Sequence, residues 1–137
     1  KKMSKSELSD LSRINLTDDK DLIINKIKKA KTDPLPLPSS PNELKERPEA
    51  KNLLGIYSSI TNSTIDKTVN EFNGKNFSEF KDKLSQVLVE KINPISQEIK
   101  KLINDKGFLD KILLEGHKKA NKIASDKVKK MQEIVGF

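Results

Sequence analysis

The chain has 137 residues, the size of one ordinary domain, and hydrophobic and charged residues each make up 34% of it. It holds 27 Lys and Arg against 20 Asp and Glu, and the resulting net charge of +7 suits a phosphate-rich partner. The absence of Cys excludes disulfides, thiol nucleophiles and thiolate zinc sites, and a single His excludes a pair of His metal ligands.

The N-terminal residues predict a loop followed by a first helix. Residues 1–19 are rich in Ser, Lys and Asp, which favours a loop and a short extended stretch. Residues 20–31 place apolar side chains at helical spacing, and either Asp18 or Asp19 is a suitable N-cap. The lysines near the end of this helix, Lys26 among them, complement the helix dipole.

A proline-rich connector follows at residues 33–42. Its four prolines remove backbone donors and push the preceding residues toward extended geometry. The spacing of Pro38 and Pro41 also matches a PxxP ligand of aromatic grooves, a spacing that is common in linkers.

Helical periodicity then continues to the C-terminus. Helices are predicted after Pro48 to about residue 62 and over residues 63–72, followed by a long apolar stripe over residues 77–103. Pro94 lies within that stripe, so we expect the helix to kink or restart there. Gly107 is predicted to end it.

A short helix over residues 108–113, a turn at Gly116 and a last helix from about Ala120 complete the pattern. No stretch alternates with a period of two long enough to indicate a sheet, so the predicted fold is all-α, with about six helices. Tyr57 and the five Phe residues fall on apolar stripes and are interpreted as core residues, not as platforms for base stacking.

The most informative motif is the N-terminal pentapeptide Lys2, Met3, Ser4, Lys5 and Ser6. Two ammonium groups and nearby backbone amides on a loop can close over a polyphosphate and neutralise charge that develops on a leaving pyrophosphate. The alternative interpretation of the same residues is a solvated basic terminus.

The pentapeptide is spelled like the second signature of class I aminoacyl-tRNA synthetases, KMSKS. The following sequence resembles the C-terminal part of tryptophanyl-tRNA synthetases of the bacterial and organellar type, in ordered stretches that include SRINLTD, KIKKAKTD, RPE, NLL and FNGK. Glu7 and Leu8 depart from the family, in which Asp-Pro is frequent at this place.

The resemblance implies a KMSKS loop and link over residues 1–19 and a helical, anticodon-binding C-terminal domain over residues 20–137. In this family a Rossmann-type catalytic domain precedes the signature, and the first residue here is Lys1, so we expect the chain to be a piece of a longer protein. By similarity, Lys2 and Lys5 would contact the ATP phosphates and act in catalysis, while Met3, Ser4 and Ser6 would complete the ATP-binding loop.

The function that follows from the resemblance is that of a tryptophan-tRNA ligase, which activates L-tryptophan with ATP and Mg²⁺ and charges tRNA(Trp). We expect the parent to be a cytoplasmic homodimer without membrane contact, because the apolar runs fall far short of the roughly 20 residues that span a bilayer. The piece alone is expected to be inactive. A stand-alone basic helical module that binds RNA is the alternative, and a structural scaffold without a nucleic-acid partner is a third possibility.

The last helix carries a second candidate site. Its lysines are dense enough to follow an RNA backbone, and the tRNA-binding candidates are Lys118, Lys119, Lys122 and Lys129. A solvated helix face is the alternative. His117 is interpreted as a surface or capping residue, and the carboxylates are not spaced as a metal site.

Overall fold

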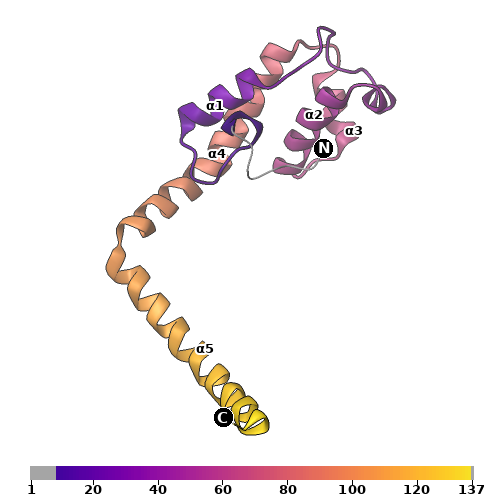
Figure 1. Cartoon of the computed structure of the whole chain (residues 1–137). Helices are drawn as coiled ribbons and strands as arrows, with labels where there is room; N and C mark the ends of the chain where they lie inside the picture. Colours follow the sequence, from indigo (N-terminus) through magenta and orange to yellow (C-terminus); the bar gives the residue numbers. More distant parts are fainter. Residues whose placement is uncertain (1–8, 137) are drawn as a thin grey trace. The chain divides into compact units, whose positions relative to one another are not determined.

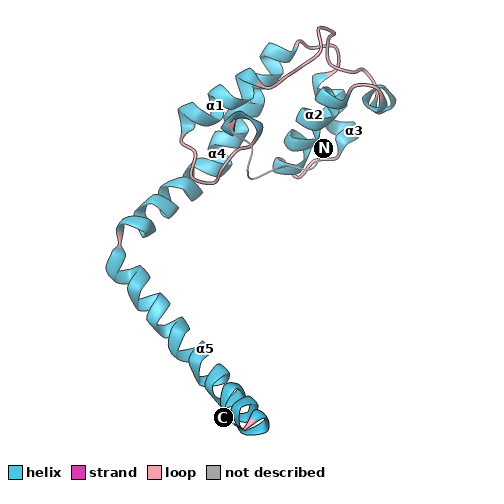
Figure 2. Ribbon diagram, viewed as in Figure 1, coloured by secondary structure: helices cyan, strands magenta, loops and turns pink. Residues whose placement is uncertain are grey.

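A computed structural model describes residues 9–136 of the chain. Over these residues the regular structure is helical and no strand is present (Figure 2), which confirms the predicted all-α fold. The α-helices are α1 (Lys20–Lys29), α2 (Pro48–Ile60), α3 (Ile65–Phe72), α4 (Phe77–Asn104) and α5 (Lys106–Val135) (Figure 1). Two short 3₁₀ helices, η1 (Asp10–Ser12) and η2 (Pro41–Lys45), flank α1 in the chain.

The chain divides into two compact units, Lys1–Gln97 and Glu98–Phe137. The first unit contains η1, α1, η2, α2, α3 and most of α4, and the second contains the end of α4 and all of α5. The prediction of one anticodon-binding domain over residues 20–137 stays a prediction.

The first unit is held together by one apolar core. Three aromatic rings lie at its centre: Phe72 packs edge-on against Tyr57 and Phe80, with ring centroids 4.9 and 4.8 Å apart. Phe80 is completely buried, and Tyr57 and Phe72 are nearly so, as the apolar periodicity predicts. Around the rings lie the buried side chains of Ile23, Ile27, Leu37, Leu44, Ala50, Leu53, Leu54, Val69, Phe77, Leu84 and Leu88.

Side-chain caps determine where the helices begin. Asp19 Oδ1 accepts a hydrogen bond from the Leu22 amide, which selects Asp19 over Asp18 as the cap of α1. Thr64 caps α3 in the same way. These caps explain why the predicted starts of both helices are accurate.

The proline-rich segment is part of the core unit. Leu37 is 2% exposed and Pro38 is fully buried, and the Leu37 amide donates to the Lys75 carbonyl over 2.8 Å. Gly74, at φ +68°, donates in turn to the Leu37 carbonyl. The PxxP interpretation is therefore wrong for this structure, because a fully buried Pro38 cannot enter the groove of a partner.

Arg47 fastens the same segment from the start of α2. Its guanidinium forms two hydrogen bonds with the Asp33 carboxylate, of 3.1 and 2.6 Å, and another of 2.7 Å with the Pro36 carbonyl. These hydrogen bonds from Arg47 hold the pKa of Asp33 below its ordinary value. The ion pair thus joins residues on both sides of η2.

We expect Asp33→Asn to lower the free energy of unfolding by about 1 kcal/mol at pH 7, because the fork of charged hydrogen bonds is lost. A carboxyl whose pKa is lowered by folding stabilises the protein above its unfolded pKa of about 3.9, and this stabilisation disappears as the pH falls through the folded pKa. The difference between Asp33→Asn and the unchanged chain should therefore close in acid. Urea titrations at pH 7 and pH 3 measure it, and Asp82→Asn, a change of an exposed Asp, should produce no such difference at either pH.

The C-terminal half has fewer breaks than the sequence predicts. Helix α4 continues through Pro94 without a restart, so that part of the prediction is wrong, while the alternative of a kink stays a prediction. Glu90, whose carbonyl would have bonded the missing amide, is exposed, so water can satisfy that carbonyl. The chain breaks instead at Asp105, whose Oδ1 accepts from the Phe108 amide and caps α5.

Gly107 and Gly116 both lie inside α5, so the predicted helix end and turn are wrong, and the short helix over residues 108–113 merges with the last one. A glycine in a helix costs only about 1 kcal/mol relative to alanine, and neither glycine has a positive φ. Phe108 is 43% exposed on this helix, so its assignment to the core is also wrong. The remaining Phe137 lies outside the described residues.

Candidate functional site

The predicted ATP-binding residues Lys2, Met3, Ser4, Lys5 and Ser6 lie outside the described residues. The first described element after them is η1, four residues beyond Ser6. The contacts of η1 are therefore the first ones that the structure describes after the signature in the chain.

An ion-pair network attaches η1 to α1. The ammonium of Lys26, in the C-terminal half of α1, lies 2.6 Å from Asp10 Oδ2 and 2.6 Å from Asp18 Oδ2. Arg13 pairs with the other oxygen of Asp10 over 2.8 Å, and the Asn15 side chain donates to both aspartates. We call these five residues the Lys26 network.

The centre of this network is shielded from solvent. The side chains of Lys26 and Asp18 are 2% and 4% exposed, whereas that of Asp10 is 45% exposed. Two cations face two carboxylates, so the network is neutral as a whole. A buried ammonium with two charged acceptors is satisfied, and removal of a partner from such a group is costly.

The charges of the network are maintained by their partners. Hydrogen bonds from Lys26 and Asn15 keep the pKa of Asp10 below its ordinary value. Burial acts to lower the pKa of Lys26, but the hydrogen bonds to Asp10 and Asp18 outweigh it and the pKa is raised. Lys26 thus stabilises the fold up to its unfolded pKa of about 10.4, and Asp10 does so above about 3.9, so the network persists throughout the neutral range.

This network is not among the features predicted from the sequence, where Lys26 is expected to complement the helix dipole and Asp18 is a possible cap. The available signal was position: Lys26 lies three residues after Ile23 and directly before Ile27, both of which are buried. A lysine on the buried face of a helix requires acidic partners, and aspartates precede it by 8 and 16 residues.

A second lysine joins α1 to α4. Lys81 donates to the Ala30 carbonyl over 2.6 Å and to the Lys28 carbonyl over 3.1 Å, at the C-terminal end of α1. Burial lowers the pKa of Lys81. An ammonium at this place satisfies carbonyls that have no partner within their own helix. Lys81 thus links the C-terminal end of α1 to α4.

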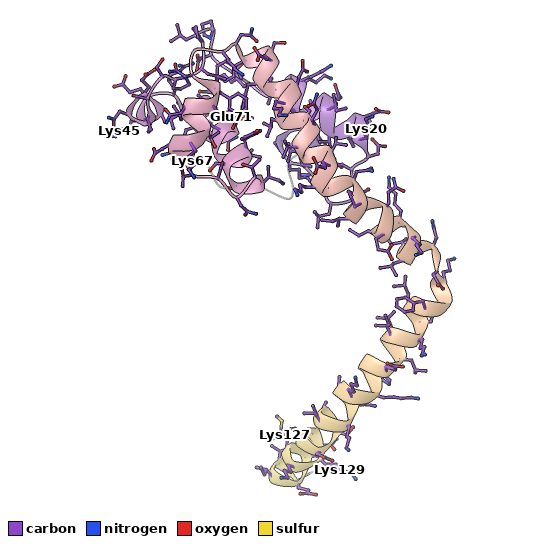
Figure 3. All side chains as sticks on the ribbon, turned by 180° about the vertical axis from the view of Figure 1, so that it is seen from behind. Lys20, Lys45, Lys67, Glu71, Lys127 and Lys129 are labelled. Atoms are coloured by element: carbon purple, nitrogen blue, oxygen red, sulfur yellow. The ribbon has the colours of Figure 1, made fainter. Side chains whose placement is uncertain are left out.

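The four candidate tRNA-binding lysines, Lys118, Lys119, Lys122 and Lys129, are all exposed on α5. At 100° per residue, Lys118, Lys122 and Lys129 share one face within about 40°, while Lys119 lies on the neighbouring face. None of the four forms an ion pair within the described part of the chain. Lys129 and Lys127 extend from the ribbon of α5 in Figure 3.

Two further properties of residues 9–136 bear on function. They contain no group of three or more His, Cys, Asp or Glu side chains that could hold a metal ion. No helix among them is both long enough and apolar enough to cross a bilayer. His117 is an exposed residue in the middle of α5, in agreement with a surface role.

Comparison with known families decides the assignment. The model of the family "tRNA synthetases class I (W and Y)" matches residues 1–93, which include the signature, η1 and the Lys26 network. This chain belongs to that family. The resemblance drawn from the signature and the ordered stretches after it is confirmed.

Relatives within the class I synthetases match the chain over its whole length. Proteins named Tryptophan--tRNA ligase from Rhizobium meliloti (strain 1021) and Agrobacterium fabrum are each 47% identical over 137 residues, which are 39% of their own length. A protein of the same name from Rickettsia felis is also 47% identical, over 41% of its length. The chain thus spans about two fifths of the class I synthetases that it matches.

Proposed function

We propose that this chain is the KMSKS loop and helical C-terminal part of a tryptophan-tRNA ligase. The observation that carries the proposal is the 47% identity to proteins of that name along all 137 residues, the signature included. The substrates of the whole enzyme would be L-tryptophan, ATP and tRNA(Trp). The single Tyr57, buried in the core with its hydroxyl on Glu71, is not available to bind substrate.

The two signature lysines would act in the first half-reaction. When the tryptophan carboxylate attacks the α-phosphorus of ATP, the bond between that phosphorus and the oxygen bridging the α- and β-phosphates breaks. Negative charge then grows on the leaving pyrophosphate. Lys2 and Lys5 would stabilise this charge, and Ser4 with its neighbouring backbone amides would support the closed loop. Met3 and Ser6 would shape the loop.

Mg²⁺ has no ligand set among the described residues of this chain. Asp10 and Asp18, the carboxylates of the described segment before α1 that lie in the Lys26 network, are already bonded to Lys26. We therefore assign no step of the reaction to a metal held by these side chains. The cytoplasmic location and the homodimer that the family resemblance implies remain part of the same proposal.

The test is a chimera in which this chain replaces the matched 39% of the Rhizobium meliloti protein. We expect tryptophan-dependent ATP–pyrophosphate exchange and charging of tRNA(Trp), with no exchange by the 137-residue chain alone, which offers one phosphate-binding loop and no second reactant site. A folded chimera that exchanges with tyrosine instead, or with neither amino acid, would refute the proposal.

We further propose that α5 contacts tRNA phosphates. Replacing Lys118, Lys122 and Lys129 together with Glu should weaken tRNA binding, because three attractive charges on one face become repulsive. Each lost phosphate contact should reduce the slope of log K against log salt by about 0.7 to 0.9. Filter binding or fluorescence titration of the chain at several salt concentrations measures the slope.

The matched control is a second triple variant, which changes the net charge by the same amount at three lysines outside α5. Lys45, Lys51 and Lys67 are exposed residues of the first unit, and two of them are labelled in Figure 3. Their replacement by Glu should leave the slope closer to that of the unchanged chain. Equal slopes in both triple variants would mean that α5 presents only a solvated basic face. Strong tRNA binding by the chain together with an inactive chimera would favour the alternative, a basic RNA-binding module without catalysis.

A further inference from the structure

An open groove runs between α1 and α4 in the first unit, where the two helices lie side by side (Figure 1, Figure 3). It measures about 470 Å³. Its floor contains the half-buried side chains of Ile24 and Val89 and the small, buried side chain of Ser85. No residue of the Lys26 network and none of the candidate tRNA-binding lysines lines this groove, so its role is a separate question.

The two edges of the groove carry opposite charges. Lys20 and Lys28, which are eight residues apart on α1, line one edge. Asp82 and Glu90, which are also eight residues apart, line the other edge on α4. All four side chains are exposed, and none of them forms an ion pair with a described residue. Their charges are therefore available to a partner.

The helices run in opposite directions along the groove. Lys81, the residue before Asp82, donates to the Lys28 carbonyl near the C-terminal end of α1. Asp82 therefore belongs to the same end of the groove as Lys28. Glu90 is about two turns further along α4 and belongs to the end at which Lys20 begins α1. Each end of the groove thus has one ammonium and one carboxylate on opposite edges.

We infer that this groove is a docking surface for a second copy of the chain. A rotation of 180° about an axis along the groove places the lysine edge of each copy over the carboxylate edge of the other. Lys20 then faces Glu90 of the second copy, and Lys28 faces its Asp82, so four ion pairs form around the apolar floors. Such a twofold contact is self-complementary. An axis across the groove would instead place lysines over lysines, so the charges select one arrangement.

Other occupants suit the groove less well. The carboxylate edge repels the phosphates of a nucleic acid or an anionic lipid. The contact is a property of this chain and does not depend on the proposed function. Because exposed ion pairs and a small apolar floor contribute little, we expect a weak dimer with a Kd of about 10–100 µM. At about 1 µM protein the dimer is therefore scarcely populated, and single variants of its residues report folding and exchange without it.

Sedimentation equilibrium of the 137-residue chain between about 1 and 500 µM tests the inference. We expect the mass to rise from that of one chain toward that of two. Lys20→Glu combined with Lys28→Glu places carboxylates opposite carboxylates and should raise Kd at least about tenfold. This is expected although each Lys→Glu change lowers the net charge by two, from +7 to +3 for the pair. Asp82→Lys combined with Glu90→Lys should weaken the dimer as strongly.

A mixture of the two reversed variants is the decisive measurement. In the mixed dimer all four pairs are again attractive, because a carboxylate edge meets a lysine edge on both sides, so association should return. Loss of folding in either variant would prevent this recovery. The control is Lys45→Glu with Lys67→Glu, which changes the net charge equally at exposed residues of the first unit outside the groove. This control should dimerise with a Kd within about threefold of the unchanged chain and should not associate preferentially with the Asp82→Lys, Glu90→Lys variant.

Three results would each overturn the inference. The first is a chain that stays monomeric up to about 500 µM, which would leave the groove to a different partner. The second is a reversed variant that dimerises like the unchanged chain, which would place the contact on another surface, such as the exposed apolar side chains of α5. The third is a mixture of reversed variants that does not associate.

Discussion

Replacing Lys5 with alanine in the chimera should lower the rate of tryptophan adenylation about a hundredfold. A cation that meets charge developing on the leaving pyrophosphate acts mainly in the transition state, where loss of one such contact typically costs about 3 kcal/mol. The KM for tryptophan should change little, because Lys5 is proposed to contact phosphate and not the amino acid. Steady-state exchange kinetics at varied ATP and tryptophan concentrations measure both parameters.

The matched control is Lys20→Ala, which removes the same charge from an exposed position at the start of α1. This variant should exchange at the unchanged rate. If Lys5→Ala keeps kcat within about twofold while the KM for ATP rises, Lys5 only anchors the ground state and the proposed role in the transition state is wrong.

Phe80→Ala should destabilise the first unit by about 3–5 kcal/mol. Phe80 is completely buried between Tyr57 and Phe72, so truncation removes apolar contacts from both rings and leaves a cavity. Tyr57 is the only tyrosine and the chain has no tryptophan, so tyrosine fluorescence in a urea titration reports on this unit alone.

The same substitution in the second unit provides the control. Phe108 is 43% exposed on α5, and Phe108→Ala should leave the tyrosine-detected transition within about 0.5 kcal/mol of the unchanged chain. If Phe80→Ala proves unfolded without urea, Phe80→Leu keeps most of the volume and should cost about 1–2 kcal/mol. Equal effects of the two alanine substitutions would contradict the arrangement of the core.

The first unit was predictable to a large extent because local signals agree there. Asp19 and Thr64 are capping residues placed directly before apolar periodicity, and Pro48 suits a first helical turn, so α1, α2 and α3 were located to within about two residues. The signature could likewise be identified from the sequence without a structure, because its five residues are consecutive. Family membership followed from it without any knowledge of the fold.

The remaining features depend on contacts between distant residues. Nothing in the local pattern at Lys26 identifies Asp10 and Asp18 as its partners, since the pairing requires η1 to fold back on α1. In α5, Gly107 and Gly116 are residues of a type that often ends helices. The free energy that each glycine costs is too small to interrupt a helix whose other residues are mostly good helix formers. Apolar periodicity also cannot tell whether a stripe meets a partner, which is why Phe108 was assigned to the core.

The pairing of Leu37 with residues 74 and 75 has a consequence for how this protein can vary. A proline-rich connection between two helices usually tolerates insertions and deletions among homologues, because its residues make few contacts that require a fixed length. Here one inserted residue between Asp33 and Leu37 would break one of two sets of contacts. It would separate either the Asp33 carboxylate from the Arg47 guanidinium or the Leu37 backbone from residues 74 and 75. Insertions and deletions in this part of the molecule should therefore concentrate outside residues 33–37. The contacts of Asp33 and of Leu37 fix the number of residues between them.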